Sequence, residues 1–286
     1  MKKASVFRIA FILLWLHSST IFAEWTRVKT GCGNYLCGMQ GGFTMNDAYL
    51  FAGMNDGVYR SPDEGSTWTA ANSGLPEGSN TNGWMNKGIT AFASGGANLF
   101  VGCLDLGVFR SIDNGDNWSK INTGLGNLTV YGLYVKEPYL FSATYNGIYR
   151  SSDLDTWAPI NNGLTSRWAY NFAAIGSRLF VATDGGGVFR SDDDGDTWSR
   201  ANKGITDIPY CFAVSDLNLF CASLGGGVFR SNDSGDNWSP VNNGLTSLWI
   251  WGMAATDQAV FVGTGDGGVF LTTDDGESWT NVGLTK

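Results

Sequence analysis

Short apolar runs, separated by clusters of glycine, asparagine and aspartate, follow one another along nearly the whole chain. A representative part of the sequence has four such runs, at 170–174, 179–183, 187–191 and 197–201. Runs of about five residues between turn-forming residues predict β-strands, because glycine, asparagine and aspartate favour the tight turns that connect strands. No helical period of apolar positions is found beyond the N-terminal segment. The pattern therefore predicts an all-β fold made of short strands.

The four-strand pattern repeats along the chain. The stretch Gly107–Trp118 has the sequence Gly-Val-Phe-Arg-Ser-Ile-Asp-Asn-Gly-Asp-Asn-Trp. Close or looser copies lie at 57–68, 147–157, 187–198, 227–238 and 268–279. The first aspartate of the stretch recurs at intervals of 50, 40, 40, 40 and 41 residues. A period near forty residues with four strands in each period predicts a single β-propeller of four-stranded blades.

The repeated Ser-x-Asp-x-Gly-x-x-Trp pattern resembles the Asp box, or BNR repeat. The resemblance is to sialidases, sortilin-type receptors, some xyloglucan hydrolases and the photosystem assembly-factor propellers. Ser111, Asp113, Gly115 and Trp118 match the pattern in full, and three other blades also do. The match covers nearly the whole mature chain. Because this repeat occurs in proteins of unrelated activity, it implies the fold and says little about function.

We expect the repeated residues to stabilise the turn between strands three and four of each blade. A short carboxylate accepts backbone N–H bonds within its own turn, a glycine adopts positive φ, and a tryptophan covers the loop with apolar surface. One carboxylate per blade spreads the acids around a rim, so the structural interpretation is favoured over calcium binding. The expected structural residues are Asp63, Asp113, Asp153, Asp193, Asp233 and Asp274, with Trp68, Trp118, Trp157, Trp198, Trp238 and Trp279. The third copy, 151–157, lacks the glycine and one residue, which predicts an irregular turn.

The number of blades follows from the number of copies. Six copies predict six four-stranded blades, with seven as the alternative. The segment Trp25–Gly31 resembles the outer strand at 118–124, and the last repeat has its own candidate at Trp279–Val282. We expect the N-terminal strand to cover or replace the final outer strand, which would remove an exposed edge. A seventh blade would need about forty residues that the sequence lacks.

The first 23 residues have the pattern of a signal peptide. Lys2, Lys3 and Arg8 precede an apolar run at 9–16, and Ala23 is a suitable small residue before a cleavage site. The run is too short to cross a bilayer as a helix. We therefore expect a signal peptide at 1–23, a propeller domain at 24–286, and a secreted or periplasmic protein that does not insert into membranes.

Composition excludes several kinds of chemistry. His17 is the only histidine and lies in the predicted signal peptide, so a mature chain has no Ser-His-Asp triad, Cys-His pair or histidine-ligated metal. The first 23 residues hold three of the 18 basic residues and none of the 26 acidic ones, so the remainder carries a formal net charge of −11. Such an acidic protein is a poor partner for nucleic acid. We expect no metal and no cofactor.

The five cysteines enter an oxidising compartment if the chain is secreted. Cys32 and Cys37 can close a small loop, and Cys211 and Cys221 lie on two predicted neighbouring strands at positions that face each other. Cys103 is left over, and we expect it to be buried. Possible disulfides therefore involve Cys32, Cys37, Cys211 and Cys221.

Aromatic residues gather at the end of the blades opposite the repeated turns. Aligning the repeats places Tyr131, Tyr170, Tyr210 and Trp251 at one inner-strand position, with Trp168 and Trp249 two residues earlier on the same side. The turns between strands two and three add Asp56, Asp105, Asn146, Asp184 and Asp266. A long connection at 76–88 adds Trp84 on this side. The predicted binding residues are Trp84, Tyr131, Trp168, Tyr170, Tyr210, Trp249, Trp251, Asp184 and Asp266.

Three interpretations of these aromatics stay open. They suit a sugar-binding surface, a protein-binding hot spot, or simple packing of the central channel. A sialidase is not favoured, because five of the nine mature arginines occupy one repeated structural position: Arg60, Arg110, Arg150, Arg190 and Arg230. Paired carboxylates of a glycoside hydrolase remain the alternative. The leading hypothesis is a non-catalytic module with no catalytic residues, which binds a protein or an extracellular glycan. The resemblance to the photosystem assembly-factor propellers implies a protein-assembly role.

Overall fold

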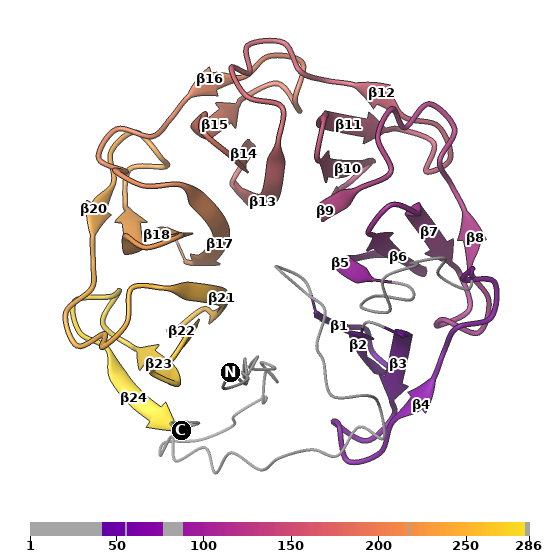
Figure 1. Ribbon diagram of the computed structural model, residues 1–286, viewed down its shortest axis with the longest axis horizontal. Helices are drawn as coiled ribbons and strands as arrows, with labels where there is room; N and C mark the ends of the chain where they lie inside the picture. Colours follow the sequence, from indigo (N-terminus) through magenta and orange to yellow (C-terminus); the bar gives the residue numbers. More distant parts are fainter. Residues whose placement is uncertain (1–41, 55, 77–87, 217, 284–286) are drawn as a thin grey trace, which may run out of the picture.

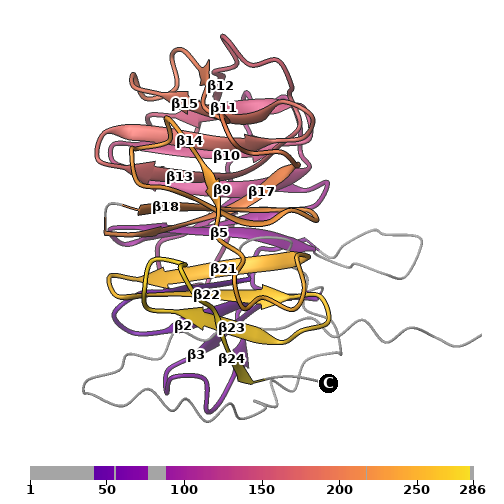
Figure 2. The ribbon, with the colours of Figure 1, turned by 90° about the vertical axis from the view of Figure 1, so that its left-hand side faces the viewer.

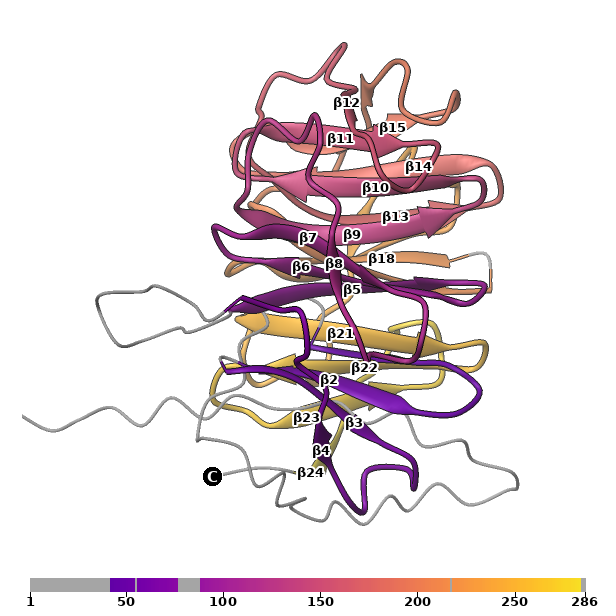
Figure 3. The same cartoon turned by 90° about the vertical axis from the view of Figure 1, so that its right-hand side faces the viewer.

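A computed structural model describes residues 42–54, 56–76, 88–216 and 218–283 of the chain. Six four-stranded antiparallel sheets are arranged around a centre, each with its first strand innermost and its fourth outermost (Figure 1). Seen from the sides, the ring is a flat disc whose inner strands run across its thickness (Figures 2 and 3). The described residues contain no helix. The prediction of an all-β propeller with six four-stranded blades is confirmed.

Each blade takes four consecutive strands. Blade one is β1 (Phe43–Met45), β2 (Leu50–Met54), β3 (Gly57–Ser61) and β4 (Thr69–Ala70). Blade two is β5 (Ile89–Gly95), β6 (Asn98–Cys103), β7 (Gly107–Ser111) and β8 (Ser119–Lys120). Blade three is β9 (Val130–Lys136), β10 (Tyr139–Thr144), β11 (Gly147–Ser151) and β12 (Ala158–Pro159).

The second half of the chain repeats this order. Blade four is β13 (Ala169–Ile175), β14 (Arg178–Thr183), β15 (Gly187–Ser191) and β16 (Ser199–Arg200). Blade five is β17 (Pro209–Ser215), β18 (Asn218–Ser223), β19 (Gly227–Ser231) and β20 (Ser239–Pro240). Blade six is β21 (Ile250–Thr256), β22 (Ala259–Thr264), β23 (Val269–Thr272) and β24 (Thr280–Gly283). The strands predicted in blade four agree with these bounds within one or two residues.

The hydrophobic core lies between neighbouring blades. The second strands of the first five blades each bury a phenylalanine completely or almost completely: Phe51, Phe100, Phe141, Phe180 and Phe220. Apolar clusters join blades one and two, two and three, three and four, and four to six. Because both faces of the sheets in blades two to five pack on a neighbour, these blades cannot bury their apolar surface alone.

The final blade completes its own sheet. Its outer strand β24 comes from the C-terminal end and pairs with β23. The expectation that an N-terminal strand replaces this strand is therefore wrong, because residues 280–283 already supply its backbone hydrogen bonds. Whether Trp25–Gly31 covers β24 concerns residues outside the described part of the chain, as does the expected signal peptide.

The repeated turns are held by their own side chains. In blade four, the Ser191 hydroxyl donates to Asp193 (2.7 Å) and accepts from the N–H of Gly195 (2.7 Å). The carboxylate of Asp193 also accepts from the side chain and backbone N–H of Thr197. These hydrogen bonds, led by the Thr197 hydroxyl, lower the pKa of Asp193 to about 2.

The turn in blade three is irregular, as its missing residue predicts. Asp153 accepts from the N–H groups of Asp155 and Thr156, two and three residues later, whereas the aspartates of the other blades accept from the N–H four residues later. Ser151 donates to Asp153 (3.0 Å), but its hydroxyl accepts no glycine N–H because the loop lacks that glycine. The shortened loop still places Trp157 normally, since its indole donates to the carbonyl of Ile121 in blade two.

Five of the six loop tryptophans join their blade to the preceding one. The Trp198 indole donates to Ile160 O (2.8 Å), and its backbone N–H donates to Asn162 O (2.9 Å). Trp118, Trp157, Trp238 and Trp279 make the same indole contact. Trp68 in blade one instead donates to Gly65 O in its own loop. The tryptophans therefore act in assembly of the ring, which agrees with the expected structural role.

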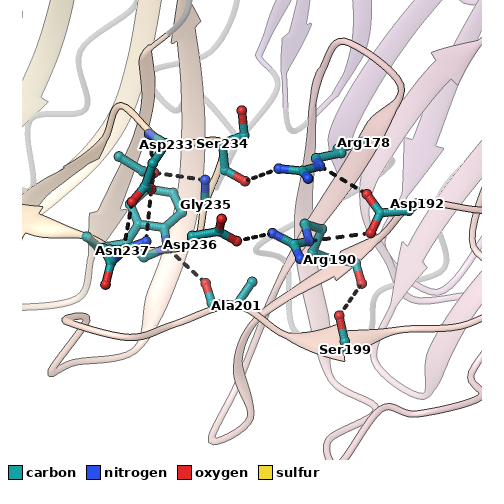
Figure 4. Close-up of polar contacts among 12 residues, drawn as sticks. Arg178, Arg190, Asp192, Ser199, Ala201, Asp233, Ser234, Gly235, Asp236 and Asn237 are labelled. Atoms are coloured by element: carbon teal, nitrogen blue, oxygen red, sulfur yellow. Dashed lines mark hydrogen bonds and ion pairs between the residues drawn. The ribbon is translucent and has the colours of Figure 1, made fainter.

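The repeated arginines reach forward to the next blade. Arg150 donates to Asp194 O (2.7 Å) and pairs with Asp196 (2.9 Å), and Arg60 and Arg230 make equivalent contacts. Arg190 pairs with Asp236 of the next blade, and Arg178, which pairs with Asp192 in its own blade, joins the same junction by donating to Ser234 O (Figure 4). The sequence-based assignment of these arginines to structure is supported by every one of these contacts.

The described cysteines are free thiols, not disulfides. The expected pairing of Cys211 with Cys221 is wrong, because β17 and β18 are in a different register. Cys221 lies opposite Phe212 and Cys211 lies opposite Ala222, so the two thiols point to opposite faces of the sheet. Cys103 is buried as expected, and burial raises the pKa of its thiol to about 12. Cys32 and Cys37 lie outside the described residues.

Candidate binding face

A β-bulge occurs at the same point of five inner strands, near the end opposite the repeated turns. In β13, Ala169 pairs with Thr183 and Asn171 with Ala182, so Tyr170 is the extra residue. The equivalent residues of the other strands are Thr90, Tyr131, Tyr210 and Trp251. A bulge bends the strand and changes the direction of a side chain. The sequence alignment correctly grouped Tyr131, Tyr170, Tyr210 and Trp251, but it did not reveal the bulge that they share.

Three of these bulge residues pack together. The ring centroids of Tyr131 and Tyr170 are 5.9 Å apart, and those of Tyr170 and Tyr210 are 5.4 Å apart. Trp168 lies 5.6 Å from Tyr170 and 6.1 Å from Tyr131. Burial, with smaller contributions from Asp184 and Tyr131, raises the pKa of Tyr170 to about 12.

The predicted binding roles of Tyr170 and Tyr210 need correction. Tyr210 is fully buried and Tyr170 is 5% exposed, so neither presents its ring to solvent. They are packing residues beneath the face, which was the third interpretation left open by the sequence. Tyr131 and Trp168 are partly exposed above them.

A second aromatic group lies on blade six. Trp249 and Trp251 are 56% and 38% exposed, with ring centroids 6.5 Å apart and a 42° angle between their planes. Trp249 precedes β21, and its carbonyl accepts from the N–H of Gly265 in the β22–β23 turn. A Cβ added to Gly265 would lie 3.1 Å from Trp251 Nε1 and 3.5 Å from Trp249 Cβ, so the turn passes close beside the Trp251 ring and the base of the Trp249 side chain.

The exposed apolar residues are unevenly distributed. Among the described residues, five of the seven large exposed hydrophobic side chains lie at the end of the blades where the inner strands begin: Leu128, Tyr145, Leu248, Trp249 and Trp251. We call this end the aromatic face. Met45 and Ile112 lie at the opposite end. Clustered exposed apolar side chains mark interaction surfaces more often than scattered ones do.

Tyr145 was missed by the sequence analysis. It occupies the β10–β11 turn, is 53% exposed, and lies 4.9 Å from Trp168. Sequence reasoning considered the neighbouring Asn146, because the other turns carry polar residues there. The sequence did place Tyr145 in a turn at the aromatic end of the blades, which was the one indication that it belongs to the site. Trp84, by contrast, lies outside the described residues.

Carboxylates surround the aromatic face. Two sets of positions border this face: the turns between the second and third strands of each blade, and the two residues before each inner strand. Among the described residues at these positions, Arg167 is the single basic one. Five are acidic: Asp56, Asp105, Asp184, Asp207 and Asp266. Asp105 accepts from the Thr129 hydroxyl (2.5 Å), and Asp105 and Asp266 are exposed. Asp184 lies near enough to Tyr170 to raise its pKa, as noted above.

A concave site of different character lies between blades four and five. This depression of about 300 Å³ is lined by Arg190, Arg200, Ala201, Asn202, Lys203, Gly235 and Asp236. The ion pair of Arg190 with Asp236 crosses it, and Arg178 donates to Ser234 O above it (3.4 Å) (Figure 4). These contacts join two blades, so we assign the depression to the blade junction. No group of three metal-ligating side chains is found in the part of the chain that the structure describes.

The geometry defines a six-bladed β-propeller with an aromatic, acidic end. Residues 105–227, less than half of the chain, match the family described as the DUF6242 beta propeller domain. No curated protein matches the sequence.

Solved structures of low sequence identity share the fold. The extracellular domain of the putative one component system BT4673 from B. thetaiotaomicron has 16% identity and a TM-score of 0.65, over 80% of this chain and 32% of that one. YCF48 from Cyanidioschyzon merolae has 15% identity and a TM-score of 0.65, over 90% and 88%. The GH74 xyloglucanase from Xanthomonas campestris has 17% identity and a TM-score of 0.67, over 90% and 46%. This chain thus spans about a third of the BT4673 domain and about half of the xyloglucanase.

In the described residues, no helix has the length and apolar character needed to span a bilayer.

Proposed function

We propose that this protein is a secreted, non-catalytic binding module that holds a protein or glycan partner on its aromatic face. The observation that carries the proposal is the exposed Trp249–Trp251 pair, together with the gathering of exposed apolar side chains at that end. Tyrosine and tryptophan are enriched where partners bind, because a large ring buries much apolar area at little cost in conformational entropy. A periplasmic or extracellular location follows from the signal peptide expected at 1–23.

We further propose that the six repeated turns are Asp boxes with a structural role. A serine, or Thr272 in blade six, and an aspartate make hydrogen bonds within each turn, and the tryptophans of blades two to six bond to the preceding blade. These side chains are already engaged in the fold, which leaves the aromatic face as the better place for a partner.

Two features of related folds inform the kind of partner. A structure of YCF48 contains a bound D1 peptide, which supports a peptide or protein partner here. The fold likeness to a xyloglucanase supports glycoside hydrolysis as the second candidate. In this chain, Asp184 and Asp266 belong to the turns of blades four and six, so catalysis would need a pair of acids contributed by separate blades. An Asp184→Asn or Asp266→Asn variant that binds a glycan normally but loses hydrolysis would favour the enzyme.

Tryptophan fluorescence of the mature protein tests the binding proposal. Titration with a panel of oligosaccharides and peptides should give a saturable change for a partner of the aromatic face. Trp249→Ala should weaken that binding by about tenfold or more, since exposed aromatic anchors often dominate an interface. Met45→Ala, an exposed apolar change at the opposite end, is the matched control and should leave the affinity unchanged. Equal loss in both variants, or none in Trp249→Ala, would count against the aromatic face.

A further inference from the structure

We infer that the partner of the aromatic face presents a cationic side chain, such as arginine or lysine, to Trp249 and Trp251. This inference rests on the proposed function and adds the chemistry of the recognised group. The exposed rings, the nearby acidic turn and the overall charge of the face each favour a cation.

The two rings can accommodate a cation directly. A cation within about 6 Å of the centroid of an aromatic ring is attracted by the negative potential above the plane of that ring, and tryptophan gives the strongest attraction. The centroids of Trp249 and Trp251 are 6.5 Å apart, so one guanidinium group can contact both rings. Among the described residues no arginine or lysine lies over either ring, although Arg60 over Tyr49 (4.8 Å) and Arg150 over Tyr139 (4.7 Å) make this contact elsewhere.

A carboxylate lies in the turn beside the rings. Gly265 touches Trp251 and Trp249, and Asp266 follows it as an exposed residue. No hydrogen bond or ion pair within the described residues engages the Asp266 carboxylate. Aromatic rings beside an ionised carboxylate give a cation two favourable interactions, one with the ring faces and one with the charge.

The charge of the whole face points the same way. The described residues in its turns and just before its inner strands include five acidic ones and one basic one, Arg167. The acidic residues are Asp56, Asp105, Asp184, Asp207 and Asp266. The full chain has a formal net charge of −8. Such a field attracts basic partners and repels acidic ones, and the attraction weakens as salt screens it. A neutral glycan can donate hydroxyl hydrogen bonds to these acids but gains no long-range attraction from their charge, so the charge favours a basic peptide segment.

Matched synthetic peptides test the inference. An octapeptide alternating arginine and glycine, its glutamate counterpart, and a neutral cello-oligosaccharide are titrated against the mature protein while tryptophan fluorescence is followed. The arginine peptide should saturate the change and the glutamate peptide should not. Raising the salt from about 0.05 to 0.5 M should weaken arginine-peptide binding by about tenfold or more, because the Debye length becomes comparable to the contact distance.

Three variants locate the interaction. Asp266→Asn removes the charge with little change of shape, and Trp251→Ala removes one ring; each should weaken arginine-peptide binding by about five- to tenfold. Asp257→Asn is the matched control, since Asp257 is an exposed aspartate in the β21–β22 turn at the opposite end of the same blade. The control should bind as the unaltered protein does.

The outcomes separate this inference from the proposed function. Equal binding of the arginine and glutamate peptides, no binding of the arginine peptide, or unchanged affinity in Asp266→Asn overturns the cationic partner. Salt-independent binding of the oligosaccharide that Trp249→Ala abolishes overturns it as well, yet leaves the aromatic face as a binding site. A broad panel in which no ligand depends on Trp249 or Trp251 overturns both.

Discussion

Individual side chains in the repeated turns have distinct hydrogen-bonding duties. The hydroxyl of Ser191 both donates to Asp193 and accepts from Gly195, whereas the carboxylate of Asp193 receives donors from Thr197. Because Ser191 and Gly195 are buried, the Gly195 N–H cannot turn to water when the hydroxyl is removed, whereas the exposed carboxylate of Asp193 can. Blade three offers a natural comparison, since Ser151 makes the bond to Asp153 alone.

Replacing Ser191 with alanine should therefore cost more than the same change at Ser151. Ser191→Ala leaves the Gly195 N–H buried without a partner, which should lower the free energy of unfolding by about 1–3 kcal/mol. Ser151→Ala should cost about 1 kcal/mol or less, because it removes one bond to an exposed carboxylate. Urea denaturation of both variants measures the difference. Equal losses would show that the glycine bond contributes nothing.

At the scale of the element, the distance from a glycine to the backbone of the neighbouring blade decides how much the fold depends on that glycine. Gly163 follows the outer strand of blade three, has a φ of 94°, and would place a Cβ 2.0 Å from the carbonyl of Trp198 in the next blade. Gly74, Gly124, Gly204 and Gly244 are in the same situation. Gly185, in the β14–β15 turn, has a φ of 67° but no atom within 4 Å of an added Cβ. The two positions separate backbone strain from collision between blades.

Gly163→Ala should be far more damaging than Gly185→Ala. The first change combines left-handed strain with a collision against backbone and should lower the free energy of unfolding by more than about 3 kcal/mol. The second carries strain alone and should cost about 1–2 kcal/mol. Thermal unfolding followed by circular dichroism gives both values. If Gly185→Ala lowers the free energy of unfolding as much as Gly163→Ala does, the backbone strain at positive φ explains the whole loss and the collision adds nothing.

On the scale of the whole molecule, the ring depends on bonds between blades. Arginine and tryptophan contacts recur at the junctions, but three departures stand out. The arginine position of blade six is Leu271, and Trp68 of blade one bonds to its own loop. At the junction of blades two and three, Arg110 lies 3.8 Å from Asp155 in the shortened loop and instead donates to Asn98 in its own blade (2.7 Å). The junctions therefore differ in how strongly they are held.

Arg150→Leu, which copies the residue of blade six, should weaken the ring more than Arg110→Leu. Arg150 bonds to a carbonyl and a carboxylate of the next blade, so its loss should cost about 1–2 kcal/mol. Arg110→Leu removes a contact with the next blade that is already long and should cost less than about 1 kcal/mol. Thermal denaturation at low and high salt compares them, and the Arg150→Leu deficit should shrink as salt rises. A larger loss for Arg110→Leu would contradict this view of the junctions.

The sequence by itself determined the architecture. Six copies at a period near forty, each with four short apolar runs, specify six blades, because the repeat is local and each copy carries its own turn residues. It also placed the aromatic positions at the correct end, since the order of strands fixes which turns share an end.

Tertiary structure alone decided which of those aromatics are accessible. Tyr210 and Trp251 occupy the same bulge position, yet one is fully buried and the other 38% exposed, because exposure depends on the neighbouring blade. The same holds for Cys211 and Cys221, whose faces were set by a bulge that shifts the register by one residue. Repetition encodes what every blade shares. What distinguishes one blade from another, including the candidate site, arises only when the blades pack against each other.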